Sequence, residues 1–284
     1  MTGQDPVTTR AWVDPAPVRA LAALFDDAIT APEPGEALPP LWHWAALANW
    51  APAGLTGPDG HPRVGGFLPD VGKPRRMFAG GSVEFHAPLL VGDQVERQDA
   101  VLSVTPKSGR QGDFVLVQVQ TLVFNPAGEL ALTETQDLIY RDEAPARPTA
   151  SEHPPVAAAP IHPALLTRNQ RGEWALATDP VKLMRFSAAT SNAHRIHYDW
   201  PYATQVEGYP ALVVHGPLQT LAMAEVLRLE SISSISKITH RGTKPLFCGD
   251  PALITTTSTN AHHLDLTLTS STGTHSTLSV QPSW

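Results

Sequence analysis

Apolar residues recur along the chain at two spacings, which predict where helices and strands form. Helical spacing is found at residues 12–28 and 181–189, and an aromatic-rich stretch at residues 41–50 is also expected to be helical. Residues 214–229 are apolar almost all round, so we expect a helix that is buried on every side and wrapped by a sheet. The Gly- and Pro-rich loop at residues 51–74 is too long to be idle, so we expect it to line a site or to be mobile.

Two blocks of strands accompany these helices. Both blocks contain alternating or continuous apolar runs bounded by turn-forming residues, which is the pattern of β-strands. The strands are expected at residues 82–86, 101–105, 114–124 and 131–140, at residues 235–240, 252–258, 263–269 and 274–280, and at a short segment, residues 174–177. Because the connections inside each block are too short for parallel crossovers, each block predicts an antiparallel sheet.

The chain contains an internal repeat. The hexapeptide PLLVGD at residues 88–93 returns as PLFCGD at residues 245–250, each time between strands, which favours two copies of one structural unit. A Pro- and Ala-rich segment between the copies is typical of a linker. We therefore expect an N-terminal unit at residues 1–142, a linker at residues 143–163 and a C-terminal unit at residues 164–284. The same offset places a segment without histidine, residues 35–40, opposite residues 192–197. We therefore expect the C-terminal unit to be catalytic and the N-terminal unit to be non-catalytic and to bind substrate.

Composition narrows the class of protein. With 284 residues, of which 42% are hydrophobic and 17% charged, the chain is typical of a globular protein. A net charge of −7 and the lack of a long basic run argue against a nucleic-acid partner. Cys248 is the single cysteine, which excludes an internal disulfide framework and favours a reducing compartment. Since no stretch matches a signal peptide or a bilayer span, we expect a cytoplasmic protein with no membrane partner.

Candidate catalytic residues gather just before the apolar helix. Five side chains that can exchange protons, form hydrogen bonds or bind anions lie within eight positions: Asn192, His194, Arg195, His197 and Asp199. The helix then begins near His215 and Gly216. Histidine exchanges protons near neutral pH, and a helix N-terminus stabilises negative charge. This layout predicts acid–base catalysis on a substrate that develops an oxyanion.

These segments resemble a known family. The sequences FSAATSNAHRIHYDWPYA (residues 186–203) and VVHG (residues 213–216), with PLWHW (40–44), GGFLP (65–69) and RRMFAGGSVEFH (75–86), are similar to the MaoC-like, type 2 hydroxyacyl-thioester dehydratases. The similarity is to the subgroup that includes mesaconyl-C4-CoA (3-methylfumaryl-CoA) hydratase, and it spans most of residues 40–257. It implies an α+β double hot-dog fold, in which two antiparallel sheets each wrap around a central helix.

The resemblance also implies an activity, that of a hydro-lyase which reversibly hydrates a 2-enoyl thioester to a 3-hydroxyacyl thioester. His197 would be the acid–base group, Asn192 would orient the water, and the N–H of Gly216 would hold the thioester oxygen. The leading substrate is 3-methylfumaryl-CoA or a similar short branched acyl-CoA. We expect no metal and no cofactor apart from CoA as part of the substrate. The expected partner is an acyl-CoA or acyl-ACP (acyl-carrier protein) substrate, and a homodimer is the candidate assembly.

Substrate contacts are expected from six further residues: His194, Arg195, Asp199, Val214, His215 and Arg76. Four of them have structural alternatives. His194 is also suited to a surface position. Arg195 is equally suited to a surface salt bridge, Asp199 to capping a turn, and His215 to satisfying backbone groups at the helix start. The choice between these roles stays open at the level of sequence.

The motif departs from the wider family at two positions. The family's Asp, five residues before the catalytic histidine, is Asn192 here, and its Asn, three residues before, is His194. An amide cannot exchange protons. The partner of His197 in proton transfer is therefore left open.

Three alternative functions remain. One is a 3-hydroxyacyl-ACP or acyl-CoA dehydratase of fatty-acid or polyketide type. Another is a non-catalytic thioester-binding hot-dog protein, which would tolerate the substitution His197→Ala. The third is a non-haem iron enzyme with His197, Asp199 and His215 as a facial triad, which metal analysis would detect.

Overall fold

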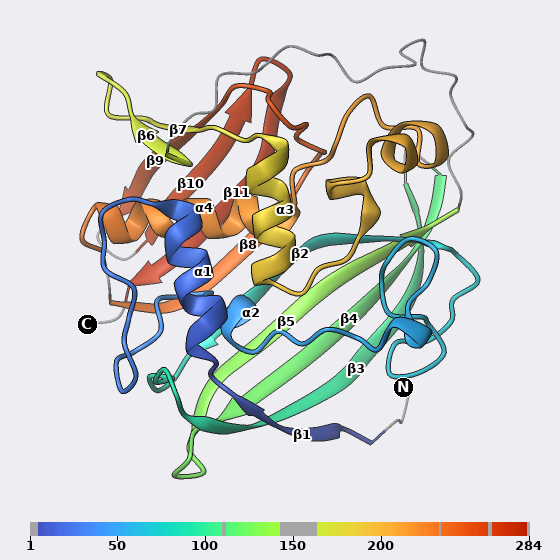
Figure 1. Ribbon diagram of the computed structural model, residues 1–284, viewed down its shortest axis with the longest axis horizontal. Coiled ribbons are helices and arrows are strands. Elements are labelled where there is room, and N and C mark those ends of the chain that lie inside the picture. The colour runs from blue at the N-terminus through green and yellow to red at the C-terminus, as the bar shows by residue number, and fades with distance from the viewer. Residues whose placement is uncertain (1–4, 110–111, 143–163, 233, 261–262, 283–284) are drawn as a thin grey trace.

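The computed structural model describes residues 5–109, 112–142, 164–232, 234–260 and 263–282, and their strands form one eleven-stranded antiparallel sheet (Figure 1). The N-terminal half contributes β1 (Val7–Trp12), β2 (Arg75–Phe85), β3 (Gln94–Gly109), β4 (Gly112–Phe124) and β5 (Leu130–Arg141). The C-terminal half contributes β6 (Leu166–Arg168), β7 (Trp174–Leu176), β8 (Ile235–Gly242), β9 (Ala252–Asn260), β10 (His263–Ser270) and β11 (Gly273–Pro282). The spatial order, β1-β3-β4-β5-β2-β8-β11-β10-β9-β7-β6, keeps the strands of each half together.

The halves of the sheet meet where β2 pairs with β8. Gly80 lies opposite Arg241 and Glu84 opposite Lys237 in this ladder. Only glycine fits at position 80, because a Cβ would lie 2.6 Å from the carbonyl oxygen of His240. The expected α+β double hot-dog fold is confirmed, with its two antiparallel sheets joined edge to edge into one.

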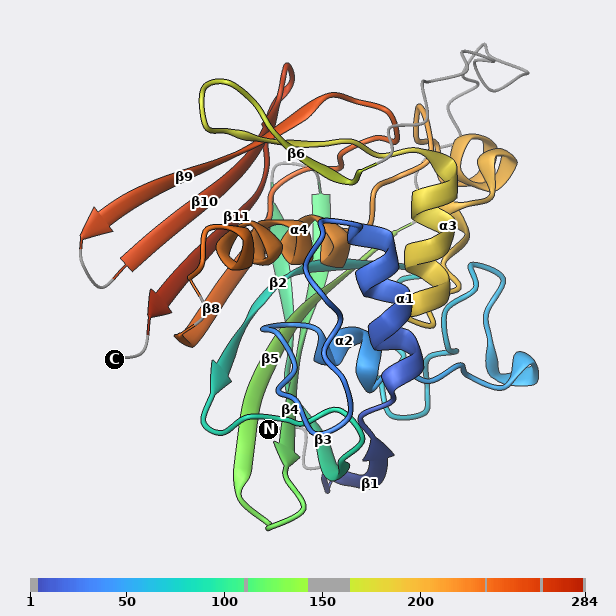
Figure 2. The same ribbon diagram turned by 60° about the vertical axis from the view of Figure 1, so that its left-hand side comes forward.

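Two helices, α1 (Pro15–Phe25) and α3 (Pro180–Ala189), lie side by side (Figures 1 and 2). Each starts with an aspartate cap followed by proline: Asp14 accepts from the N–H of Ala16 at 2.8 Å, and Asp179 accepts from the N–H of Lys182 at 2.9 Å. The helix expected at residues 12–28 is therefore shorter. Trp12 pairs in the unpredicted strand β1, and the chain turns into the left-handed region at Asp26.

The helix α4 (Gly216–Leu229) lies in the curve of β8–β11 (Figure 2). Every residue from Leu218 to Leu227 is buried, which confirms the prediction of an enclosed helix. In the N-terminal half, by contrast, the expectation of a full central helix is wrong, because α2 (His43–Ala46) has a single turn. It follows Leu41, whose φ of 69° lies outside the helical region, and it has no side-chain cap at its N-terminus.

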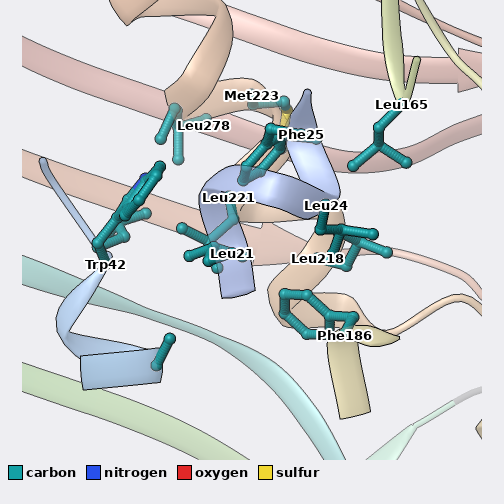
Figure 3. Close-up of a cluster of buried hydrophobic side chains, with 14 of the residues drawn as sticks. Leu21, Leu24, Phe25, Trp42, Leu165, Phe186, Leu218, Leu221, Met223 and Leu278 are labelled. Atoms are coloured by element: carbon teal, nitrogen blue, oxygen red, sulfur yellow. The ribbon is translucent and has the colours of Figure 1, made fainter. Parts of the chain in front are cut away.

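One hydrophobic core joins the two halves (Figure 3). Phe25 stacks on Trp42 with ring centroids 6.2 Å apart, and both pack in the same cluster as Leu218 and Leu221 of α4. Trp42 also donates to the carboxylate of Glu225 at 3.2 Å. Because this core is shared, the N-terminal half holds α4 from the side that the C-terminal sheet leaves open.

The internal repeat has a structural counterpart. Gly92 and Gly249 both adopt positive φ, 90° and 87°, in turns that follow isolated bridges of the same kind, Ala37 with Leu90 and Val213 with Phe247. Aligning the two halves by these bridges shows that residues 35–40 are not the counterpart of residues 192–197, as the constant offset had placed them. Between helix and bridge the C-terminal half has residues 190–212, whereas the N-terminal half has only residues 26–36. The histidine motif thus lies in an extra segment and has no N-terminal counterpart.

The expected linker, residues 143–163, lies outside the described residues. Among the helices of the described residues, none combines the length and the apolar character needed to cross a membrane.

Candidate active site

A cavity of about 830 Å³ lies where the two halves meet. Its wall includes Arg76 and Phe78 of β2, His61 of the long loop, and His197 and Gly216 of the C-terminal half. This volume is in the range of sites that bind small molecules. The loop at residues 51–74 therefore lines this cavity, which was one of the two roles expected for it.

Local turns carry the histidine motif to this cavity. After α3 the chain reverses at Ser191, which has a φ of 49°. The side-chain oxygen of Asn192 accepts from the N–H of His194 at 3.0 Å, and a 3-10 turn (Arg195–His197) follows. The N–H of Val213 then donates to the carbonyl of Ile196 at 3.0 Å. Asn192 lines the cavity, but its oxygen already acts as a turn acceptor.

His197 faces the cavity in a defined tautomer. Its Nδ1 lies 2.7 Å from the carbonyl oxygen of Val213. Because a carbonyl can only accept, Nδ1 carries the proton and Nε2 keeps a lone pair. Burial lowers the pKa of His197 to about 3, although the hydrogen bond to Val213 opposes this shift. At neutral pH the imidazole is therefore uncharged and able to accept a proton.

His215 supports His197 from behind. The two rings stack with centroids 3.6 Å apart, and Nε2 of His215 lies 2.8 Å from the hydroxyl of Ser187. Burial, followed by the neighbouring His197 and His194, lowers the pKa of His215 well below its ordinary value. The side chain is fully buried and is not part of the cavity wall. His215 therefore positions the ring of His197 and does not make the expected contact with substrate.

Gly216 presents its backbone to the cavity. As the first residue of α4, it has an N–H without an acceptor inside the helix, and the helix dipole adds positive potential there. A Cβ at this position would lie 2.9 Å from Cδ1 of Phe78, so glycine lets the opposite wall come close. Val214, which also lines the cavity, is held by its N–H to the carbonyl of Leu246 at 2.8 Å. An oxyanion placed beside Gly216 would find a donor and a helix N-terminus.

Comparisons with known proteins agree with this geometry. The family described as hydroxyacyl-thioester dehydratase type 2 matches residues 41–248. The chain belongs to this family. It is 41% identical over 228 residues to a mesaconyl-C(4)-CoA hydratase of Chloroflexus aurantiacus, covering 80% of this chain and 78% of the relative. It is 23% identical over 270 residues to a mitochondrial type 2 hydroxyacyl-thioester dehydratase of Schizosaccharomyces pombe, covering 85% and 83%.

Solved structures share the fold of this type 2 dehydratase. HtdX of Mycobacterium tuberculosis superposes with a TM-score of 0.64 at 19% identity, covering 98% of this chain and 100% of that one. A MaoC-like dehydratase superposes with a TM-score of 0.69 at 14% identity, covering 98% of both chains. Family membership makes the chain an enzyme, a hydro-lyase that acts on acyl thioesters.

Arg195 and Asp199 of the dehydratase hold the motif together and do not line the cavity. Their side chains pair at 2.7 Å, and Asp199 also accepts from the N–H of Tyr202 at 3.1 Å. Arg195 thus forms the salt bridge, and Asp199 caps the turn, that the sequence offered as alternatives to substrate contacts. The iron triad of His197, Asp199 and His215 does not form: among the described residues, the one set with metal-ligand spacing is Asp59, His61 and His194.

Two arginines of β2 differ in their availability. Arg75 is engaged by Glu207 at 2.6 Å and by the hydroxyl of Tyr209 at 3.1 Å. Arg76 lines the cavity and forms no salt bridge with the carboxylates of the described residues. Its charge is one of the causes that lower the pKa of His61 and His194, after burial, which is the largest. Arg76 is thus a cation facing the cavity whose charge acts on the carboxylate of Asp59 without forming a salt bridge with it.

The sequence did not single out Asp59 and His61. Oδ2 of Asp59 lies 2.8 Å from Nδ1 of His61, and the ring of His61 lies 4.0 Å from that of His194, centroid to centroid. Burial lowers the pKa of His61, while the hydrogen bond that His61 donates to Asp59 opposes this shift. The available signal was the Asp-Gly-His triplet inside a loop already expected to line a site.

Proposed function

We propose that this hydro-lyase hydrates a short branched 2-enoyl-CoA with a free carboxylate, and that 3-methylfumaryl-CoA (mesaconyl-C4-CoA) is its substrate. The observation that carries the proposal is that His197 and the first residue of α4, Gly216, line one cavity. The name of the Chloroflexus relative, which is 41% identical, supports the choice of acyl group. CoA enters as part of the substrate, and the reaction needs no group beyond protein side chains and backbone donors.

Hydration then follows from the placement of these groups. Nε2 of His197 takes a proton from water as the water oxygen bonds to C3. The electron pair of the C2=C3 bond moves toward the thioester oxygen, where the N–H of Gly216 donates. C2 takes a proton as the carbonyl re-forms, and Asn192 helps to orient the water through its amide.

The free carboxylate of the substrate needs a cation, and Arg76 supports this part of the proposal. A guanidinium can bind a carboxylate through two parallel hydrogen bonds. Arg76 comes from the N-terminal half, whereas His197 and Gly216 come from the C-terminal half. We therefore assign acyl-group binding to residues 1–142 and the oxyanion donor to residues 164–284, as the domain expectation has it.

A spectrophotometric hydration assay over a panel of enoyl-CoAs tests the proposal. We expect hydration of 3-methylfumaryl-CoA and a loss of about 10²–10⁴-fold in kcat for His197→Ala. Arg76→Gln should raise KM for 3-methylfumaryl-CoA at least tenfold and leave KM for crotonyl-CoA, which has no carboxylate, within about threefold. No hydration of any acyl-CoA, or equal rates for wild type and His197→Ala, would contradict the enzyme assignment and favour a thioester-binding protein.

The description of the family names dehydration of a hydroxyacyl thioester, so the second candidate is dehydration of a 3-hydroxyacyl chain carried by acyl-carrier protein or CoA. It uses the same groups in reverse. Parallel assays with 3-hydroxyacyl chains on CoA and on acyl-carrier protein distinguish the two. A kcat/KM higher on acyl-carrier protein would replace the CoA proposal.

A further inference from the structure

Hydration needs two proton transfers, and one side chain has been assigned to them so far. A base takes a proton from water and an acid delivers one to C2, yet the carboxylate that the wider family places before its histidine is Asn192 here. His197 is the single side chain assigned so far that can exchange protons. Another proton-transfer group therefore has to reach the same cavity, or His197 has to carry out both transfers.

His61 reaches this cavity from the other half of the chain. It lines the cavity wall together with His194 and His197. The ring centroids of His61 and His194 are 4.0 Å apart, and those of His194 and His197 are 5.4 Å apart. The ligand atoms of Asp59, His61 and His194 all lie within 4.8 Å of one another. One water molecule can bridge ring nitrogens at that separation.

Asp59 prepares His61 for proton transfer. Its carboxylate lies 2.8 Å from Nδ1 of His61, so Nδ1 donates and Nε2 is left with the lone pair. A carboxylate in this position orients an imidazole and stabilises the imidazolium that forms when Nε2 gains a proton. Nδ1 of His197, by contrast, donates to the neutral carbonyl of Val213 and not to a carboxylate.

The loop that carries His61 is built against the histidine motif. The carbonyl of Asp59 accepts from the N–H of Arg195 at 2.9 Å, and the carbonyl of Pro58 accepts from the guanidinium of Arg195 at 3.0 Å. Gly60 adopts a φ of 92° and packs its Cα against the carbonyl of Ala193. These contacts hold His61 at a fixed place relative to His194 and His197.

Charges around His61 favour proton transfer over metal binding. Asp59 faces it with a negative charge, Arg76 with a positive charge, and His194 and His197 as uncharged rings. Two histidines and a carboxylate are also a metal-ligand set. The positive charge of Arg76 opposes the binding of a metal cation in the same pocket.

We propose that the Asp59–His61 pair is the second proton-transfer group of this hydratase. His197 takes the proton from water as the O–C3 bond forms, and the C2=C3 electron pair moves to the thioester oxygen. The proton passes through His194 and bridging water to Nε2 of His61, where Asp59 stabilises it. His61 then delivers it to C2 as the carbonyl re-forms, so all three imidazoles end uncharged, as they began. This inference rests on the proposed hydration.

The test uses the full chain and four variants: His61→Gln, Asp59→Asn, His197→Ala and, as a matched control, His86→Gln at an exposed histidine outside this cavity. Hydration of 3-methylfumaryl-CoA is measured from about pH 3 to 9, with thermal unfolding at each pH as the check on folding. We expect kcat to fall about 10²-fold or more in His61→Gln, with KM within threefold, and His86→Gln to match wild type. Asp59→Asn should lower kcat and move the acidic limb of the profile to lower pH, because its negative charge favours the imidazolium.

The outcomes separate this inference from the proposed function. If wild type hydrates the substrate and His197→Ala does not, but His61→Gln keeps kcat within threefold, the second proton-transfer group is not His61. An unmoved acidic limb in Asp59→Asn overturns the pair, even if kcat falls through a structural effect. Stoichiometric metal in the wild-type protein that is lost in His61→Gln also overturns it, in favour of a metal site. If wild type hydrates nothing, the proposed function itself fails.

Discussion

The substitution Gly60→Ala should uncouple the loop at residues 51–74 from the histidine motif. The added Cβ would lie 1.9 Å from the carbonyl oxygen of Ala193, whereas ordinary contact begins at 3.4 Å. Because the obstacle is backbone, the loop has to move by about 1.5 Å. A displacement on the order of 1 Å in a catalytic group can cost about 10²-fold in rate. The positive φ adds a cost of about 1–3 kcal/mol to folding.

The assay compares Gly60→Ala with Gly54→Ala in the same loop, where an added Cβ has no neighbour within 4 Å and φ is not positive. Kinetics with 3-methylfumaryl-CoA and thermal unfolding are measured on both. We expect a kcat loss of about 10²-fold for Gly60→Ala with a folded protein, and values close to wild type for Gly54→Ala. Wild-type kcat in Gly60→Ala would refute the role given to this loop.

Two further predictions concern buried polar groups. Ser187→Ala leaves Nε2 of His215 without its partner, so we expect a loss of about 1–3 kcal/mol of stability by chemical denaturation and a kcat reduced with unchanged KM; unchanged stability would contradict the role of that hydrogen bond. Glu134 is buried, which raises its pKa, but hydrogen bonds from His43, Gln136 and Trp44 outweigh this and lower the pKa to about 2. The ionised Glu134 therefore contributes to the free energy of unfolding above its unfolded pKa of about 4.5, and this contribution is lost as the pH falls toward 2. Between pH 5 and pH 2 the free energy of unfolding should fall by up to about 3 kcal/mol more in wild type than in Glu134→Gln, measured by chemical denaturation. An equal fall in the two proteins would refute the reasoning.

The elements with strong periodicity could be predicted from sequence. The buried helix at residues 214–229 lies where the pattern placed it, because burial on all sides selects apolar residues throughout. The strand β4 also lies where it was expected, because every second residue of it is buried. The short edge strands β1 and β6 could not be predicted, since their side chains are largely exposed and the partner strand decides their conformation. The reduction of residues 41–50 to one turn depends on backbone geometry at Leu41, which apolar spacing does not report.

Site residues could likewise be predicted where they are close together in the sequence. His197, Asn192 and Gly216 could be located because they belong to one continuous stretch before one helix, and all three line the cavity. The role of His215 could not be decided from sequence, because spacing does not tell which side of a backbone turn a ring occupies. His61 was missed for a different reason. It is far from His197 in sequence, and only the folded chain brings its loop against residues 193–195.

The asymmetry of the two halves explains why the cavity exists. A full central helix in each half would fill the concave face of the sheet with side chains, as α4 does on the C-terminal side. The one-turn α2 instead leaves Trp44, Leu47 and the facing residues of β2 and β5 as walls of open space. α4 keeps its N-terminus at the edge of that space, where Gly216 has a free N–H. Shortening one helix and keeping the other therefore provides room for an acyl group next to a donor for its thioester oxygen.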